Sequence, residues 1–336
     1  MCACEERIHV SWGCQQEAQL MKMLIRGLLG VVVCIGILGQ IAVAFGPCSS
    51  AKECYTKGDK ATDTNEKIEY FTKTLEFNPT YIDAYRSRGS AYADKGDYDL
   101  AFADYTKVLE FQPSNALMYN YRGAIYTKQE KYPEALTDYA KAIELEPNNA
   151  YHYYRRGNTY KEQQFYDEAV YDYTKAISLA RNDSYYYNSR GNVYIQKKLY
   201  DQAISDYTKS IEVEPNRANT YYYRGNAYTE KKLYDQAIAD YTKSLELDPN
   251  DVYFYRSRAV SYEKTWDYKH AIEDYTKAIE QNPNYGNAYY FRGNIYKKIG
   301  VNDNAVADYE RYLELVPDAS DRAQVEQWIQ ELKSKK

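Results

Sequence analysis

Arginines and aspartates at fixed spacing are the residues of this sequence best suited to do chemistry. An arginine stands three residues after a tyrosine in segments such as "YYYRGNAY" (Tyr221 to Tyr228). The arginines are Arg88, Arg122, Arg156, Arg190, Arg224, Arg258 and Arg292, and the matching aspartates are Asp104, Asp138, Asp172, Asp206, Asp240, Asp274 and Asp308. Because an unpaired buried charge is costly, we expect each arginine to pair with an aspartate, within one repeat or between neighbours. This pattern favours a structural role over ligand binding.

Other chemistry finds little support in the residues. The three histidines, His9, His152 and His270, are far apart, and all six cysteines precede residue 55. No metal-ligand spacing, phosphate loop or nucleophile motif is present in the sequence. The sequence therefore predicts a protein that is not an enzyme and that uses no metal and no cofactor.

The charge balance argues against nucleic acid as a partner. The chain of 336 residues has a net charge of −5, and its lysines and arginines are mixed with acids. A nucleic-acid surface would need clustered basic residues. We expect a protein or an extended peptide instead, and the oligomeric state stays open.

A period of 34 residues positions the paired charges. The glycine after the arginine recurs at this step, as Gly89, Gly123, Gly157, Gly191, Gly225 and Gly293, and Ala259 fills the one gap. Tyr85, Gly89 and Tyr92 fall on one helical face, and Ala101, Tyr105 and Val108 form a second such face. A proline closes most periods, with Arg181 as the exception. Each period therefore predicts a hairpin of two helices.

These residues resemble the tetratricopeptide repeat family. Its pattern W-x2-L-G-x2-Y, A-x3-F and P corresponds to Tyr221, Arg224, Gly225, Tyr228, Ala237, Tyr241 and Pro249, with arginine where the family usually has leucine. The resemblance implies an all-α, right-handed superhelical solenoid of about eight helix-turn-helix repeats over residues 46–319. Repeats would begin near residues 48, 82, 116, 150, 184, 218, 252 and 286. Residues 320–336 have the apolar spacing of a C-terminal capping helix.

The resemblance also implies that the first helices line a concave groove for a ligand. The predicted groove residues are Tyr154, Asn158, Asn188, Asn192, Tyr222, Asn226, Arg256, Tyr290 and Asn294. Amides that donate and accept suit a peptide backbone, and tyrosines supply rigid contact area. The alternative, that these asparagines bond only locally, stays open. The lysine and asparagine set with which some relatives bind a C-terminal carboxylate is absent.

We therefore expect a noncatalytic scaffold that binds an extended peptide or a partner protein in this groove. Two alternatives are a module that binds glycans or envelope polymers through groove tyrosines, and a self-assembling structural element.

The N-terminus predicts export. Residues 21–45 read as a signal peptide or membrane anchor, because Lys22 and Arg26 precede the uncharged stretch Gly27 to Phe45. Residues 1–20 are a possible upstream extension. The repeats would then be periplasmic, secreted, or anchored outside the cytoplasm. Cys48 and Cys54 would meet oxidising conditions there, but they can pair only if Cys48 lies outside the helix.

Overall fold

The computed structural model describes residues 48–334, in which every regular element is a helix. The predicted extension and the signal peptide or anchor lie outside these residues. Among the residues described, no helix is both long and apolar enough to cross a bilayer.

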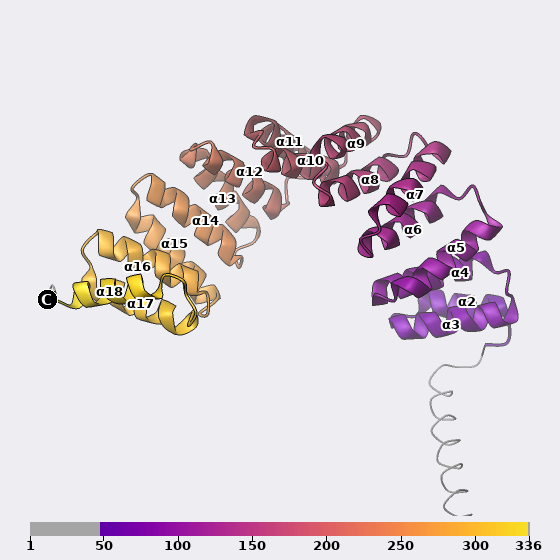
Figure 1. Cartoon of the computed structure of the whole chain (residues 1–336), viewed down its shortest axis with the longest axis horizontal. Coiled ribbons are helices and arrows are strands. Elements are labelled where there is room, and N and C mark those ends of the chain that lie inside the picture. The colour runs from indigo at the N-terminus through magenta and orange to yellow at the C-terminus, as the bar shows by residue number, and fades with distance from the viewer. Residues whose placement is uncertain (1–47, 335–336) are drawn as a thin grey trace, which may run out of the picture. The chain divides into compact units, whose positions relative to one another are not determined.

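The chain divides into two compact units, and the boundary between them in the sequence lies between Ser114 and Asn115. Unit 1 holds α2 (Ala51–Lys60), α3 (Thr64–Phe77), α4 (Ile82–Lys95) and α5 (Tyr98–Phe111). Unit 2 holds α6 (Ala116–Lys128), α7 (Tyr132–Leu145), α8 (Ala150–Glu162), α9 (Tyr166–Leu179), α10 (Ser184–Gln196), α11 (Tyr200–Val213), α12 (Ala218–Glu230), α13 (Tyr234–Leu247), α14 (Val252–Lys264), α15 (Tyr268–Gln281), α16 (Gly286–Lys298), α17 (Asn302–Leu315) and α18 (Arg322–Lys333). Figure 1 labels these helices.

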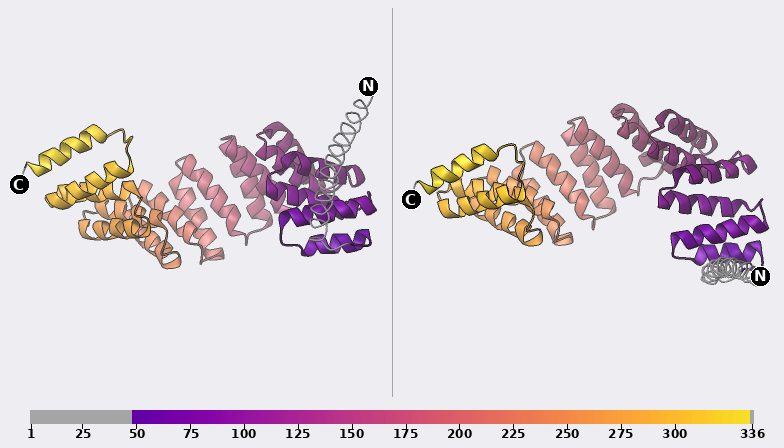
Figure 2. Two further views of the ribbon diagram at one scale, coloured as in Figure 1. Left: turned by 90° about the horizontal axis from the view of Figure 1, so that it is seen from below. Right: turned by 60° about the horizontal axis from the view of Figure 1, so that its bottom comes forward.

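Helical hairpins make up both units. The two helices of a hairpin pack on one another, and within a unit each hairpin packs on the next, as the run from α6 to α18 shows in both views of Figure 2. The predicted all-α architecture of helix-turn-helix repeats is confirmed. Helix α18 packs on α17 through Val325, Ile329 and Leu332, which are buried.

Local sequence explains where the helices begin and turn. The side chains of Asn149 and Asp183 accept backbone N–H bonds at the starts of α8 and α10, which fills donors that a helix start leaves free. From α4 onward, the turn between the two helices of a hairpin contains a residue with positive φ, which is a glycine at Gly96 and Gly300 and another residue elsewhere, as at Trp266. Glycine adopts this backbone without strain, whereas Trp266 holds it at φ 65° while 70% exposed.

The core of each hairpin from α4 onward is a tyrosine of the second helix, and Phe71 has this place in the hairpin of α2 and α3. Tyr173, Tyr207 and Tyr241 are at most 1% exposed. A Cβ atom added at Gly225 would lie 2.7 Å from Cε1 of Tyr241, so glycine is needed for the close approach of the first helix to this ring. The sequence suggests Ala237 as the neighbour of Gly225, but the tyrosine ring is the nearest group.

Candidate functional site

Each recurring arginine forms a bidentate ion pair with the aspartate of its own hairpin. In the hairpin of α12 and α13, Arg224 donates from Nε to Oδ2 of Asp240 at 2.8 Å and from Nη2 to Oδ1 at 2.7 Å. The same two bonds join Arg88 to Asp104, Arg122 to Asp138, Arg156 to Asp172, Arg190 to Asp206, Arg258 to Asp274 and Arg292 to Asp308. Of the two arrangements left open by the sequence, the structure has the pair within a repeat.

A third bond of the arginine reaches the preceding hairpin. Nη1 of Arg224 donates to the hydroxyl of Thr208 in α11 at 3.0 Å. Equivalent bonds join Arg88 to Thr72, Arg190 to Thr174, Arg258 to Thr242 and Arg292 to Thr276. These threonines were not predicted from the sequence, although they recur with the same period in segments such as "DYTK". The arginine therefore joins two neighbouring hairpins.

The surroundings of the pairs are mostly apolar and aromatic. The guanidinium of Arg224 lies 5.8 Å from the ring centre of Tyr221 and 6.0 Å from that of Tyr228. The side chains of Arg224 and Asp240 are 17% and 8% exposed. Burial outweighs the arginine bonds and raises the pKa of the carboxyl groups of Asp104, Asp172, Asp206, Asp274 and Asp308.

The predicted groove asparagines bind the core tyrosines. The hydroxyl of Tyr207 donates to Oδ1 of Asn192 at 2.8 Å. The same bond joins Tyr173 to Asn158, Tyr241 to Asn226 and Tyr309 to Asn294, at 2.7 to 2.8 Å. These asparagines are half-buried on the first helices. Their carbonyl oxygens are therefore occupied by a local bond.

Asn188 was predicted to line the open groove, but the structure buries it. It is 8% exposed, and its Nδ2 donates to the hydroxyl of Thr220 in the next hairpin at 3.1 Å. It therefore lies in the joint between α10 and α12 and presents no open surface, because a small polar side chain stands opposite it.

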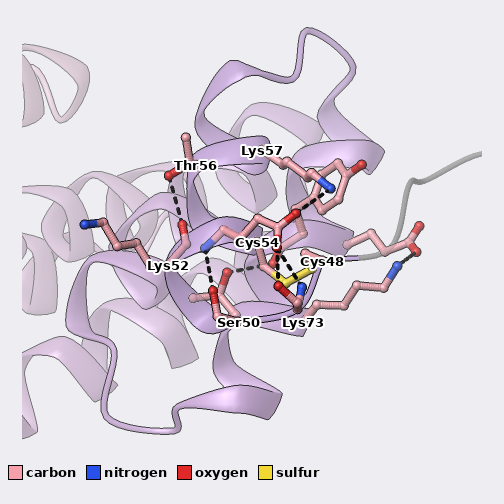
Figure 3. Close-up of a disulfide and its surroundings, with 12 residues drawn as sticks. Cys48, Ser50, Lys52, Cys54, Thr56, Lys57 and Lys73 are labelled. Carbon is pink, nitrogen blue, oxygen red and sulfur yellow. Dashed lines mark hydrogen bonds and ion pairs between the residues drawn. A yellow bond between two sulfur atoms is a disulfide. The ribbon is translucent and has the colours of Figure 1, made fainter.

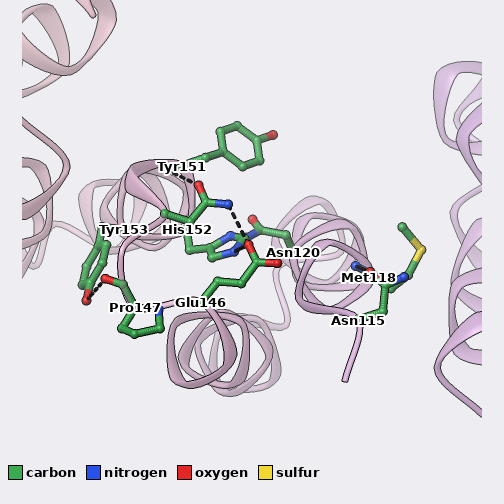
Figure 4. A network of polar contacts seen from close by, with 9 residues as sticks. Asn115, Met118, Asn120, Glu146, Pro147, Tyr151, His152 and Tyr153 are labelled. Atoms are coloured by element: carbon green, nitrogen blue, oxygen red, sulfur yellow. Dashed lines mark hydrogen bonds and ion pairs between the residues drawn. The ribbon is translucent and has the colours of Figure 1, made fainter. Parts of the chain in front are cut away.

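A related joint between α6 and α8 buries a histidine. The imidazole of His152 lies between Asn120 and Glu146 (Figure 4). Its Nε2 is 3.0 Å from Oε2 of Glu146, and its Nδ1 contacts Nδ2 of Asn120. The side-chain bonds from Asn149 and His152 lower the pKa of Glu146. An open hollow of about 630 Å³ lies beside this joint, lined by residues that include Glu146, Asn149 and Tyr186.

The predicted aromatic groove residues contact the following hairpin with part of their surface. The ring of Tyr154 lies 5.1 Å from that of Tyr186, and the ring of Tyr222 lies 4.9 Å from that of Phe254. Tyr290 instead packs on Tyr312 in α17 of its own hairpin, with the ring centres 4.9 Å apart. We call one set of nine residues on the first helices of unit 2 the first-helix face: Tyr154, Asn158, Asn192, Tyr222, Asn226, Arg256, Val260, Tyr290 and Asn294.

Unit 1 begins with a disulfide. Cys48 and Cys54 are bonded, with their Cα atoms 5.3 Å apart (Figure 3). Ser50 caps α2, so Cys48 lies outside the helix, and the chain turns back there. The two cysteines were expected to pair only if Cys48 lay outside the helix, and the structure has this arrangement.

Residues 48–334 contain no group of histidine, cysteine or acidic side chains that could hold a metal ion.

Family models match most of the repeats. Models described as tetratricopeptide repeat match residues 152–183, 218–251 and 286–318, and one described as TPR repeat matches residues 89–130, 123–164, 191–232 and 267–300. No curated protein matches the sequence.

Solved structures share the fold at low sequence identity. The C-terminal part of a TPR repeat-containing protein from Cytophaga hutchinsonii is 21% identical, with a TM-score of 0.61 over 70% of this chain and 97% of its own. A tetratricopeptide repeat protein from Parabacteroides merdae is 20% identical, with a TM-score of 0.53 over 75% and 98%. The Cut9–Hcn1 hetero-tetramer of the APC/C gives 16% identity and a TM-score of 0.51 over 84% and 54%.

Proposed function

The chain belongs to the tetratricopeptide repeat family, and from this premise we propose that the first-helix face of unit 2 binds an extended segment of a partner protein. The proposed role is that of a scaffold and requires no catalysis. Fold alone does not select a partner, so the proposal depends on the chemistry of this face.

The orientation of three amides carries the proposal. Because the core tyrosine hydroxyls donate to the Oδ1 atoms of Asn158, Asn192 and Asn226, the Nδ2 atoms of these residues remain as donors. In the described part of the chain these Nδ2 atoms have no hydrogen-bond partner. An extended peptide has carbonyl groups that lack internal partners, and a row of N–H donors would satisfy them without reading side chains.

The test removes the donors and keeps the fold. In an Asn192→Asp/Asn226→Asp variant, a carboxylate oxygen still accepts from Tyr207 and Tyr241, but the N–H groups are gone. We expect peptides selected from a random library on the full wild-type chain to bind this variant at least about tenfold more weakly, since one or two hydrogen bonds per peptide are lost.

A control accounts for the added negative charge. Asn182 is exposed in the turn between α9 and α10, and Asn182→Asp should leave peptide binding unchanged. Equal peptide affinity of wild type and the double variant, with both folded by circular dichroism, would contradict the proposal.

We also propose that the repeats operate outside the cytoplasm. Disulfides persist in oxidising compartments, and the bond between Cys48 and Cys54 directly follows the predicted signal or anchor. A membrane-impermeant protease added to intact cells should then digest the repeats, after outer-membrane permeabilisation if the cell has one. Full protection of the repeats under those conditions would refute export.

A further inference from the structure

The hairpin of α14 and α15 departs from its neighbours on the first-helix face. Val260 stands where the two preceding hairpins have Asn192 and Asn226 and the following one has Asn294. The hydroxyl of the core tyrosine, Tyr275, therefore finds another acceptor and donates to Oε1 of Glu263 at 2.5 Å. A carboxylate thus takes the role of the missing amide and brings a negative charge to this face.

Glu263 has a hydrogen-bond partner but, within the described residues, no ion pair. Burial raises the pKa of its carboxyl, and the bond from Tyr275 opposes this effect. The charges of Lys264 and Lys298 lower this pKa, and Lys298 lies over the ring of Trp266, 4.2 Å from its centre. Within residues 48–334 the carboxylate of Glu263 makes no ion pair.

Arg256, seven residues earlier in the same helix, is the opposite case. Its Nε is buried without a hydrogen-bond partner, and its guanidinium lies 5.6 Å from the ring centre of Phe291. The residue as a whole is half-exposed. Arg258, two positions on, is neutralised by Asp274, whereas Arg256 has no ion pair among the described residues. A guanidinium held in this way gains strongly from a carboxylate.

Arg256, Val260 and Glu263 follow one another at i, i+4 and i+7, so they form one strip along α14. The rise of a helix separates the two charged residues by about 10 Å. In a polyproline-type segment, residues three apart lie on the same side at about 9 Å. The distance between Arg256 and Glu263 along the helix therefore matches the distance between side chains three residues apart in such a segment.

We propose that the strip Arg256–Val260–Glu263 binds a segment of the partner protein in which an acidic and a basic side chain stand three residues apart. The acidic side chain pairs with Arg256, the basic one with Glu263, and an uncharged residue crosses Val260. This inference rests on the proposed function and adds the charge pattern of the partner to it.

Selection of a random peptide library on the full chain tests the pattern. Wild type should enrich peptides with opposite charges three residues apart. Arg256→Gln should lose the enrichment of acidic residues and keep that of basic ones, and Glu263→Gln should do the reverse. The charge-swapped variant Arg256→Glu/Glu263→Arg should enrich peptides in which the acidic and the basic residue have exchanged places, for a peptide bound in the same orientation.

Arg181→Gln is the matched control, because Arg181 is an exposed arginine in the turn between α9 and α10 without an ion pair in the described chain. It should leave the selected pattern unchanged. If wild type, Arg256→Gln and Glu263→Gln all enriched peptides with the same charge pattern, the inference would be overturned and the proposed function would stay intact. A library that enriches no peptide on wild type would overturn both.

Discussion

At the scale of single residues, the clearest structural feature is the arginine–aspartate pair. It occupies a position where apolar packing would also serve, and the surrounding burial raises the pKa of aspartates such as Asp206. For these aspartates, removing the charge from water therefore costs more free energy than the bonds to arginine return. The pair is better understood as a device that fixes geometry, since Arg224 bonds both Asp240 and Thr208.

This balance predicts different effects for single and double substitutions. Asp240→Ala leaves the guanidinium of Arg224 largely buried without its carboxylate, and should lower the free energy of unfolding by about 3–5 kcal/mol. Arg224→Leu/Asp240→Leu removes both charges and should stay within about 1 kcal/mol of wild type. Denaturant titration measures both, and a double variant as unstable as the single one would show that the pair itself supplies net stability.

The role of a single asparagine depends on a residue that lies far away in the sequence. Asn188 and Asn192 both sit on α10, and the repeat pattern alone assigns both to the same face. Thr220, in the next hairpin, buries the first by accepting its hydrogen bond. Tyr207, in the same hairpin, orients the second. Sequence periodicity predicts that both asparagines lie on one face of α10. Only three-dimensional packing shows that Asn188 is buried in a joint while Asn192 stays on the first-helix face.

At the scale of elements, the helices were predictable because several independent signals agree. The small residue at Gly225, the apolar spacing around it and the proline at Pro249 all indicate one hairpin. The arrangement of the ion pairs was not predictable. An arginine on a first helix lies near second helices of two hairpins, and the structure uses both, one for the carboxylate and one for the threonine hydroxyl.

The disulfide at the start of α2 gives a prediction for unit 1. Closing so short a loop stabilises by about 2 kcal/mol in the chain-entropy account. Cys48→Ala should therefore lower the unfolding free energy of unit 1 by about this amount and free the N-terminus of α2. Hydrogen exchange of α2 and α3 measures the change.

Unit 2 contains no cysteine, so its exchange serves as the internal control. Identical exchange of α2 in wild type and Cys48→Ala would show that the disulfide does not hold this helix.

At the scale of the whole molecule, the buried tyrosines set the response to alkaline pH. Burial raises the pKa of Tyr173, Tyr207 and Tyr241 above the ordinary value near 10. Above that pH the unfolded chain loses these protons while the folded chain keeps them, so stability falls as pH rises. Each such tyrosine contributes about 1.4 kcal/mol per pH unit.

The expected result is cooperative unfolding in alkali, in which the phenolate absorbance of the core tyrosines appears together with the loss of helical circular dichroism. Complete ionisation of all tyrosines while the helices persist would contradict this account.

The joints between hairpins also bear on how such a protein changes over generations. A single 34-residue unit encodes its arginine, the matching aspartate and, in most cases, the threonine that receives the following arginine. An in-frame duplication of the unit from 184 to 217 would thus insert a hairpin whose bonds to both neighbours, through Arg190 and Thr208, are already specified. A copy of the unit from 116 to 149, where Ala140 replaces the threonine, would insert a weaker joint. Lengthening by recombination is therefore easier in some places than in others.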